Sequence, residues 1–393
     1  MLSAIVQACK TPGRLVVVFA AFVLAACVPG AGPISGAGPA INTGEAVPVA
    51  LLVPGGSGQA TDELLARSLQ NAARLAISDL GGVKIDLRVY NTAAQPGQAQ
   101  AMAIKAADEG AKIILGPVYA QEVNAVGVAM APRGITVLSF SNNTDVAGGN
   151  VFVLGPTFDN TARRLASYAV RSGKSRIMIV HDRDTAGDLG RAAIQRGVQT
   201  AGGAVVAVGS YELSQQGIAS AIPSIAQTAK SAGANALFLT ANSATALPLV
   251  SQLLTDNGMS NATAQMIGLA RWDIPAAALA LPGVQGGWFA LPDPGLYGQF
   301  QNRYQTAFSE APHPIAGLAY DGVAAIGALV KQGKTNALST AALTQGAGYV
   351  GVNGIFRLRT DGTNERGLAI AQVRNNAAVI IDAAPRSFAG AGF

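Results

Sequence analysis

Polar side chains that could bind a ligand gather at the end of one apolar run. The segment Ile135 to Phe140 is typical of a buried strand, and Ser139, Ser141 and Asn143 stand at its end. Their hydroxyl and amide groups can donate hydrogen bonds, but no histidine is placed to activate a serine. Ligands of open α/β sheets bind at the carboxyl ends of strands, so these residues predict a binding site.

Two further segments place polar groups after predicted strands. The strand Arg176 to His181 runs directly into His181-Asp182-Arg183-Asp184, where Asp182 could contact a cation, an ammonium group or a sugar hydroxyl. A solvated loop with an internal ion pair is an equally open alternative for this segment. The tight turn Gly56-Ser57-Gly58 follows an earlier apolar strand, and Ser57 is a further candidate for the same binding site.

The sequence gives no pattern for catalysis, a cofactor or a metal. Two short runs, GKS at 173–175 and GKT at 333–335, lack the upstream glycine that a phosphate-binding loop needs. Neither histidine, His181 or His313, has other ligands at metal spacing. We therefore expect a binding protein without a cofactor, and not an enzyme.

The composition allows a large core and limits the partners. The chain has 393 residues, of which 50% are hydrophobic and 12% charged, so it is long enough for two domains. Its formal charge of +5 falls by two if Lys10 and Arg14 are removed with a signal peptide. No basic run is present, and we expect no binding to nucleic acid.

The first 27 residues have the pattern of a signal peptide. Lys10 and Arg14 precede the apolar run Leu15 to Ala26, which is too short for a comfortable membrane span. The run ends in Leu24-Ala25-Ala26-Cys27, which resembles the bacterial lipobox. The resemblance implies that Cys27 is lipidated and becomes the mature N-terminus.

The residues after Cys27 predict how the protein is anchored. In the lipoprotein pattern, Val28 in place of aspartate resembles the outer-membrane sorting signal. Residues 28–46 are rich in glycine, proline and alanine with almost no charge, which indicates a flexible tether. We therefore expect a periplasmic protein that is lipid-anchored, in the outer membrane.

From Val47 onward, predicted strands and helices alternate, and the pattern occurs twice. Each series contains a strand, a polar loop, a helix and a strand of alternating apolar and polar residues, in this order. The helix ends in ISDLGG in the first series and in VQTAGG in the second. This predicts an α/β fold of two doubly wound lobes joined by hinge strands near Gly155, Leu291 and Thr335. We expect lobe 1 to contain residues 47–155 and 284–335, and lobe 2 to contain residues 156–283 and 336–393. A closing hairpin of Val350–Arg359 with Leu368–Ile381 is expected in lobe 2.

Four segments carry a resemblance to a known family. They are ILGP at 114–117, VLSFSNN at 137–143, AYDGV at 319–323 and GVNGIFRLRTDGTNERGLAIAQVRNN at 351–376. With these, the chain resembles a type I periplasmic binding protein of the branched-chain amino-acid-binding (Leu/Ile/Val) class over nearly all of Val47 to Asp382. It also resembles the lipoprotein activators of penicillin-binding proteins, which are built on that fold.

The resemblance implies two further parts of the site. In amino-acid-binding members, a serine in the turn after ILGP holds the ligand carboxylate, and this chain has Tyr119 and Ala120 there. Their ammonium partner is an acid at the end of a strand in the second lobe, where this chain has Arg271 and Asp273. Arg271 favours an anionic ligand unless Asp273 turns inward.

The function that follows is a lipid-anchored solute-binding protein that closes two lobes over a small polar ligand, an amino acid or a related compound. Its expected partner is an ABC permease, as in amino-acid uptake. The alternative is a non-transporting outer-membrane lipoprotein that activates a penicillin-binding protein in peptidoglycan synthesis. In either case, Tyr320 and Asp321 are expected to anchor the hinge and not to act as a catalytic pair.

Overall fold

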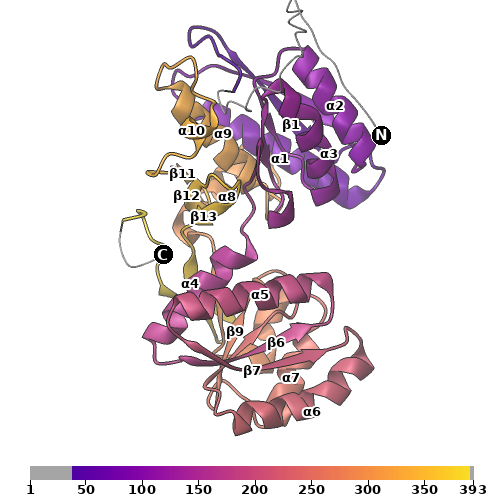
Figure 1. Ribbon diagram of the computed structural model, residues 1–393, viewed down its shortest axis with the longest axis vertical. Helices are drawn as coiled ribbons and strands as arrows, with labels where there is room; N and C mark the ends of the chain where they lie inside the picture. The colour runs from indigo at the N-terminus through magenta and orange to yellow at the C-terminus, as the bar shows by residue number, and fades with distance from the viewer. Residues whose placement is uncertain (1–37, 390–393) are drawn as a thin grey trace, which may run out of the picture. The chain divides into compact units, whose positions relative to one another are not determined.

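The computed structural model describes residues 38–389, which form two lobes, each built on a mainly parallel sheet (Figure 1). The predicted signal peptide, the lipid site Cys27 and the first part of the tether lie outside the described residues. The rest of the predicted tether, 38–46, packs on the first lobe. Ile41 is buried there, and its N–H donates to the Thr335 carbonyl at 2.9 Å. These residues are therefore not a free linker.

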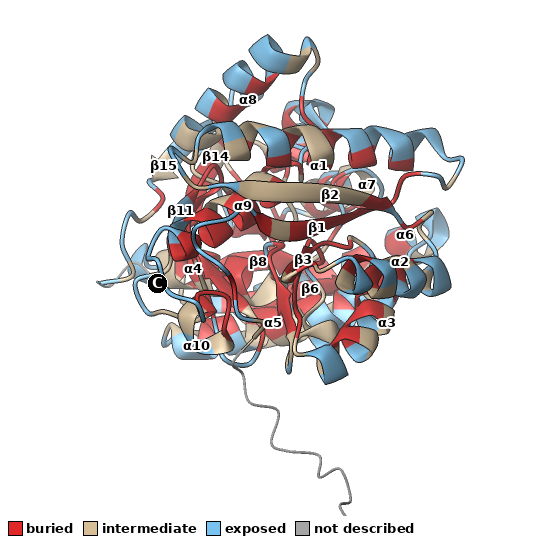
Figure 2. Ribbon diagram, turned by 90° about the horizontal axis from the view of Figure 1, so that it is seen from above, coloured by how far each residue is buried: buried red, intermediate tan, exposed pale blue. Residues whose placement is uncertain are grey.

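The first sheet has five parallel strands. In spatial order they are β2 (Ile85–Asn91), β1 (Val47–Val53), β3 (Ile113–Leu115), β4 (Thr136–Ser139) and β5 (Val151–Val153). In β1, Val49 and Leu51 enter one core cluster while Ala50 and Leu52 enter another. Both faces are covered, which is why the central strands read as continuous apolar runs. Figure 2 shows β1 buried and the edge strand β2 only partly buried.

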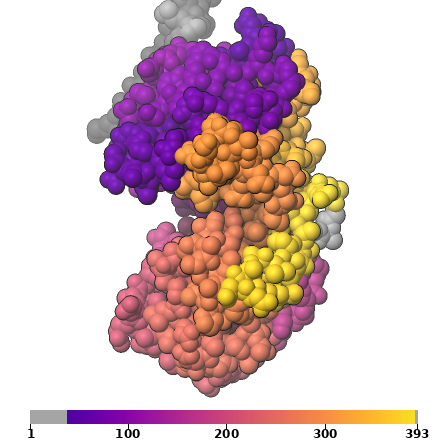
Figure 3. All heavy atoms as spheres, turned by 180° about the vertical axis from the view of Figure 1, so that it is seen from behind, coloured from indigo at the N-terminus to yellow at the C-terminus, as the bar shows by residue number. Residues whose placement is uncertain are grey.

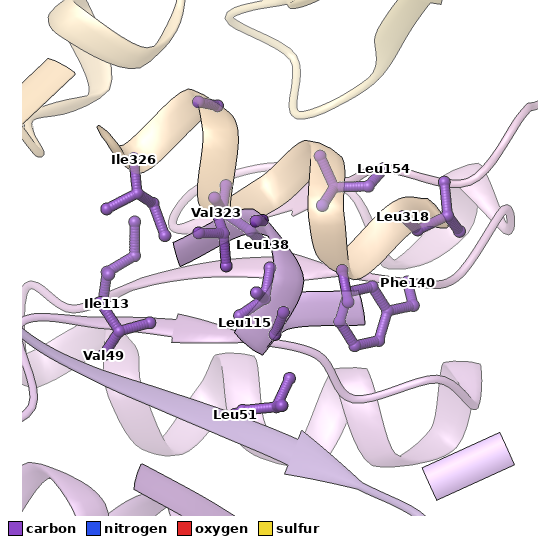
Figure 4. Packing of buried hydrophobic residues seen from close by; sticks show 14 of the residues in the cluster. Val49, Leu51, Ile113, Leu115, Leu138, Phe140, Leu154, Leu318, Val323 and Ile326 are labelled. Atoms are coloured by element: carbon purple, nitrogen blue, oxygen red, sulfur yellow. The ribbon is translucent and has the colours of Figure 1, made fainter. Parts of the chain in front are cut away.

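Helices cover both faces of this sheet. On one face lie α1 (Ala60–Ser78) and α9 (Gly317–Val330), and on the other lie α2 (Pro96–Asp108) and α3 (Ala120–Met130). Figure 4 shows Val323 and Ile326 of α9 above the strand residues Ile113, Leu115 and Leu138. Each such side chain contributes about 1.5–3 kcal/mol when fully buried, so the joining of α9 to this sheet is strongly favoured.

The second sheet has seven strands. In spatial order they are β15 (Ala377–Asp382), β14 (Ala369–Arg374), β10 (Trp288–Leu291), β9 (Gln265–Gly268), β8 (Ala236–Leu239), β6 (Arg176–Asp182) and β7 (Ala204–Tyr211). β14 and β15 are antiparallel additions to a parallel sheet. The helices α4 (Phe158–Arg171) and α5 (Thr185–Thr200) cover one face, and α6 (Gln215–Ser231) and α7 (Leu247–Asp256) cover the other.

The remaining elements complete the first lobe. A three-stranded antiparallel sheet contains β11 (Tyr349–Gly351), β12 (Gly354–Leu358) and β13 (Asn364–Arg366). The helix α8 (Pro294–Phe308) packs against α1, and the short helix α10 (Thr340–Leu343) packs against α9. Phe300, Leu343 and Phe356 all join the core cluster that contains α1 and α9.

The predicted division of the C-terminal part between the lobes is wrong in two places. Residues 284–291 were expected in lobe 1, but β10 pairs with β9 and β14 in the second sheet. Residues 336–366 were expected in lobe 2, but their buried side chains join the first-lobe core. Short apolar strands carry no local signal for the sheet that they join, since pairing depends on long-range contacts.

The predicted closing hairpin is also wrong, because each of its two strands is itself a hairpin. Val352 and Asn353 turn the chain between β11 and β12, and Asn-Gly at 353–354 is a recognised hairpin signal. Asn375 and Asn376 turn it between β14 and β15, with φ angles of 51° and 62°. Positive φ at both central residues is the requirement of a type I′ turn, and asparagine tolerates it.

The chain crosses between the lobes three times. Two crossings lie near Gly155 and Leu291, as predicted, and the third lies at Gly367 between β13 and β14, not at Thr335. The last third of the chain therefore contributes to both lobes. Figure 3 shows its orange and yellow residues beside the purple first lobe and the salmon second lobe.

A buried ion pair anchors the crossings. Asp321 on α9 is fully buried, and its Oδ2 lies 2.8 Å from Nη1 of Arg366, which donates from Nε to the Leu154 carbonyl at 2.8 Å. Asp321 also accepts from Val352 N–H at 2.8 Å and from the Asn353 side chain at 3.0 Å. The contacts of Asp321 agree with the expected anchoring role. Tyr320 faces elsewhere and donates to Asp79 at 2.6 Å.

We expect Asp321→Ala to lower the free energy of unfolding by about 3–5 kcal/mol, because it leaves the Arg366 charge buried without its partner. Urea unfolding measures this change. The matched control is Asp108→Ala, which breaks an exposed pair with Arg133 at 2.6 Å and should cost at most about 1 kcal/mol. Equal effects of the two variants would contradict an anchoring role for Asp321.

Candidate functional site

The turn after β3 brings the start of α3 to the carboxyl ends of the strands. Gly116 ends the strand with a φ of 92°, and a Cβ there would lie 2.2 Å from the Leu52 carbonyl oxygen, so only glycine fits. Helix α3 then begins at Ala120, with Tyr119 at its N-cap. The turn therefore places backbone N–H groups and the positive end of a helix dipole at this edge of the sheet.

Tyr119 is held by a neighbour on α1. Its hydroxyl donates to the Asp62 carboxylate, and its ring is partly exposed. Burial, and then the hydrogen bond to Asp62, raise the pKa of Tyr119 to about 12. Tyr119 is thus a neutral hydrogen-bonded side chain, and together with Ala120 it lines neither of the two hollows described below.

The predicted cluster on β4 and its following loop uses its polar groups to hold the chain. Ser139 Oγ accepts from Ser141 N–H at 2.9 Å, Ser141 Oγ accepts from Asn143 N–H at 3.1 Å, and Asn143 Oδ1 accepts from Asp145 N–H at 2.8 Å. Ser139 and Ser141 are buried. The three residues form successive turn-stabilising bonds, and Asn142 between them is exposed. Ser57 does the same locally by accepting from Gln59 N–H at 3.1 Å.

The loop after β6 separates its charges. Asp182 is buried, and burial raises the pKa of its carboxyl, whose Oδ1 has no hydrogen-bond partner among the described residues. Asp184 caps α5 by accepting from Gly187 N–H at 2.6 Å. Arg183 pairs with Glu212 on the surface at 3.1 Å. The loop is therefore not closed by an internal ion pair, and Asp182 lines neither of the two hollows described below.

At the end of β9, Arg271 and Asp273 contact each other. Arg271 Nε and Nη2 donate to the two carboxylate oxygens of Asp273 at 2.9 and 2.5 Å, which is the two-bond geometry of a strong pair. Both side chains are partly buried. Asp273 is thus engaged by Arg271 and is not free to receive an ammonium group.

Two adjoining hollows lie where the lobes meet. The first, which we call the arginine pocket, has a volume of about 230 Å³ and is lined by residues that include Asn142, Phe158, Leu269, Arg271, Leu318 and Arg366. The second, which we call the asparagine hollow, has a volume of about 410 Å³ and is lined by residues that include Asn142, Asn143, Phe158, Thr185 and Arg196. Asn142 and Phe158 belong to both linings, so the two hollows adjoin and we treat them as one candidate site.

Of the predicted ligand-binding residues, Asn143 and Arg271 line these hollows. The others, Ser57, Tyr119, Ala120, Ser139, Ser141, Asp182 and Asp273, line neither. Sequence reasoning missed Asn142, Phe158 and Arg366. Asn142 could have been found, since it stands between two predicted site residues on the opposite side of an extended chain. Among the described residues, no group of three or more His, Cys, Asp or Glu side chains could hold a metal, and no helix is long and apolar enough to span a membrane.

Glu122 is the third residue of α3 and is 1% exposed. Neither of its carboxylate oxygens has a hydrogen-bond partner among the described residues. Burial raises the pKa of Glu122 above its ordinary value of 4.5 and outweighs the nearby Thr92 hydroxyl and Tyr119 N–H. The folded state therefore favours the protonated form, and stability falls as pH rises from 4.5 through the raised pKa.

We expect Glu122→Gln, which stays neutral, to be more stable than the natural protein at neutral pH and equally stable below the ordinary pKa of glutamate. Urea midpoints over a pH series measure the difference. A variant whose advantage does not change with pH would show that Glu122 is ionised in the folded protein.

The comparisons with known proteins agree with this geometry. The chain matches a family model described as periplasmic binding protein over residues 46–378. No curated protein matches the chain. A structure described as a putative branched-chain amino acid ABC transporter from Rhodospirillum rubrum is similar with a TM-score of 0.72 at 18% identity, covering 86% of this chain and 100% of that chain.

Two further solved structures show the same fold. A branched-chain amino acid ABC transporter periplasmic ligand-binding protein from Burkholderia xenovorans has a TM-score of 0.69 at 16% identity, with 87% of this chain and 96% of that chain covered. An ABC transporter substrate-binding protein from Desulfitobacterium hafniense in complex with Leu has a TM-score of 0.65 at 17% identity, with 86% and 100% covered. At these identities the likeness establishes the two-lobed fold.

Proposed function

Since the chain belongs to the periplasmic binding protein family, we propose that it is the solute-binding component of an ABC transporter and holds a small carboxylate-bearing ligand, an amino acid or a related compound. The observation that carries the proposal is a site of two adjoining hollows lined from both lobes beside the crossings. A ligand there contacts both lobes at once, so binding favours the conformation in which they close on it. Such a cleft suits capture and release and offers no catalytic group.

The similar structures support transport over the alternative. Two of those reported above are described as ligand-binding or substrate-binding proteins of ABC transporters, and one of these two holds Leu. The third is described as a putative branched-chain amino acid ABC transporter. The alternative, activation of a penicillin-binding protein, depends on the predicted anchor and on the altered family positions at Tyr119 and Arg271. Transport accounts for a lined cleft, whereas a scaffold needs none.

Isothermal titration of the purified chain with amino acids, organic acids, short peptides and muropeptides tests the proposal. We expect a micromolar ligand, which corresponds to about 8 kcal/mol, and a smaller radius of gyration with the ligand bound. A flat response to every solute, combined with co-purification of a penicillin-binding protein, would instead favour the activator.

We further propose that Cys27 carries the lipid that holds the protein at the outer membrane. Since Ile41 already packs on the first lobe, the tether would be shorter than the 28–46 predicted. Cys27→Ser should move the protein to the soluble periplasmic fraction with an unchanged melting temperature, because residue 27 lies ahead of the folded lobes. Retention of the variant in the membrane pellet would contradict the lipid anchor.

A further inference from the structure

The arginine pocket has mostly apolar walls. Phe158 and Leu269 come from the second lobe, and Ile315 and Leu318 come from the first. Its volume of about 230 Å³ is below the roughly 300–1,000 Å³ of pockets that hold drug-sized ligands, so it suits a smaller molecule. The walls favour a ligand whose body is a short hydrocarbon chain or a ring.

The charged groups in the lining are all of one sign. Arg271 and Arg366 line the pocket, and none of the described residues that line it is an aspartate or glutamate. Asp273 and Asp321, the acids that pair with these arginines, do not belong to the lining. A ligand in the pocket therefore meets guanidinium groups and no carboxylate.

Each arginine has one terminal nitrogen left over. Arg271 uses Nε and Nη2 on Asp273, so Nη1 remains. Arg366 uses Nε on Leu154 and Nη1 on Asp321, and its buried Nη2 has no hydrogen-bond partner among the described residues. A buried donor without an acceptor is costly, and an acceptor that reaches it restores the lost hydrogen bond. A carboxylate is the acceptor that guanidinium donors bind most strongly.

We infer that the arginine pocket binds a small carboxylate with an apolar body and without an ammonium group. The inference rests on the proposed solute-binding function and names its ligand class. An α-amino acid presents the same carboxylate, but its ammonium group would be desolvated beside two guanidinium groups with no acid to receive it. The missing acid thus selects against amino acids.

Titration of the full chain with isocaproate, leucine and isocaproamide tests the inference. Isocaproate is leucine without its amino group, and isocaproamide replaces the carboxylate by a neutral amide. We expect isocaproate to bind about 10- to 100-fold more tightly than either of the other two, the range of one or two charge-assisted hydrogen bonds. Phenylacetate, which carries a ring in place of the branched chain, is a second positive probe.

Two variants locate the binding. Arg271→Gln should lower the affinity for isocaproate about 10- to 100-fold. It should also reduce the ratio of the affinities for isocaproate and leucine, because Asp273 loses its partner. Ala270→Leu adds apolar volume to the wall without removing a charge and should also block isocaproate. The matched control is Arg133→Gln, which breaks a similar Arg–Asp pair on the surface of the first lobe and should bind as the natural protein does.

The outcomes separate the inference from the proposed function. If leucine binds as tightly as isocaproate or more so, the inference is overturned and the solute-binding function stands. Equal binding of isocaproamide overturns it as well, since the carboxylate would then not matter. If no carboxylate binds, the inference fails, and the wider titration with amino acids, peptides and muropeptides decides the proposed function independently.

Discussion

The buried carboxylate of Asp321 is the contact that holds the first-lobe ends of two crossings together, one after Leu154 and one after Arg366. From α9 it accepts hydrogen bonds from the β11–β12 turn and from Arg366 on β13, and Arg366 in turn reaches the carbonyl of Leu154 at the first crossing. A buried charge is stable only when such partners surround it, so the network has one favoured arrangement. The backbone is fitted closely to it, because a Cβ on Gly351 would lie 2.0 Å from Asp321 Oδ1.

Two asparagines extend this network to the other side of the crossings. Asn364 Nδ2 donates to the carbonyls of Val153 and Gly155 at 2.8 and 2.9 Å, and Asn160 Nδ2 donates to Asn364 Oδ1 at 2.8 Å. The short strand β13 thus contacts the first crossing and the start of α4 through side chains. This polar junction borders the arginine pocket through Arg366 and Asn353, so the residues that join the lobes also shape the candidate site.

The sequence predicts local structure well and long-range pairing poorly. The doubled strand–helix pattern correctly indicates two α/β lobes. Local breakers also bound α3, since Pro117 precedes it and Gly134 follows it. The predicted lobes of the strand β10 and of the segment 336–366 are wrong, because short apolar strands do not encode the strands beside which they lie. Asn-Gly at 353–354 is a turn signal that could have split the predicted strand.

The candidate site was predicted only in part, for a physical reason. Loops at the ends of parallel strands must satisfy their own backbone groups, and polar side chains do so locally. Ser139, Ser141 and Asn143 have the composition of a binding site, yet their oxygens hold the chain that presents Asn142. A ligand contact is marked by hydrogen-bond donors that have no partner within the fold, as at Arg271 and Arg366. That property appears only when every partner is placed, and so it cannot be read from residue type and spacing.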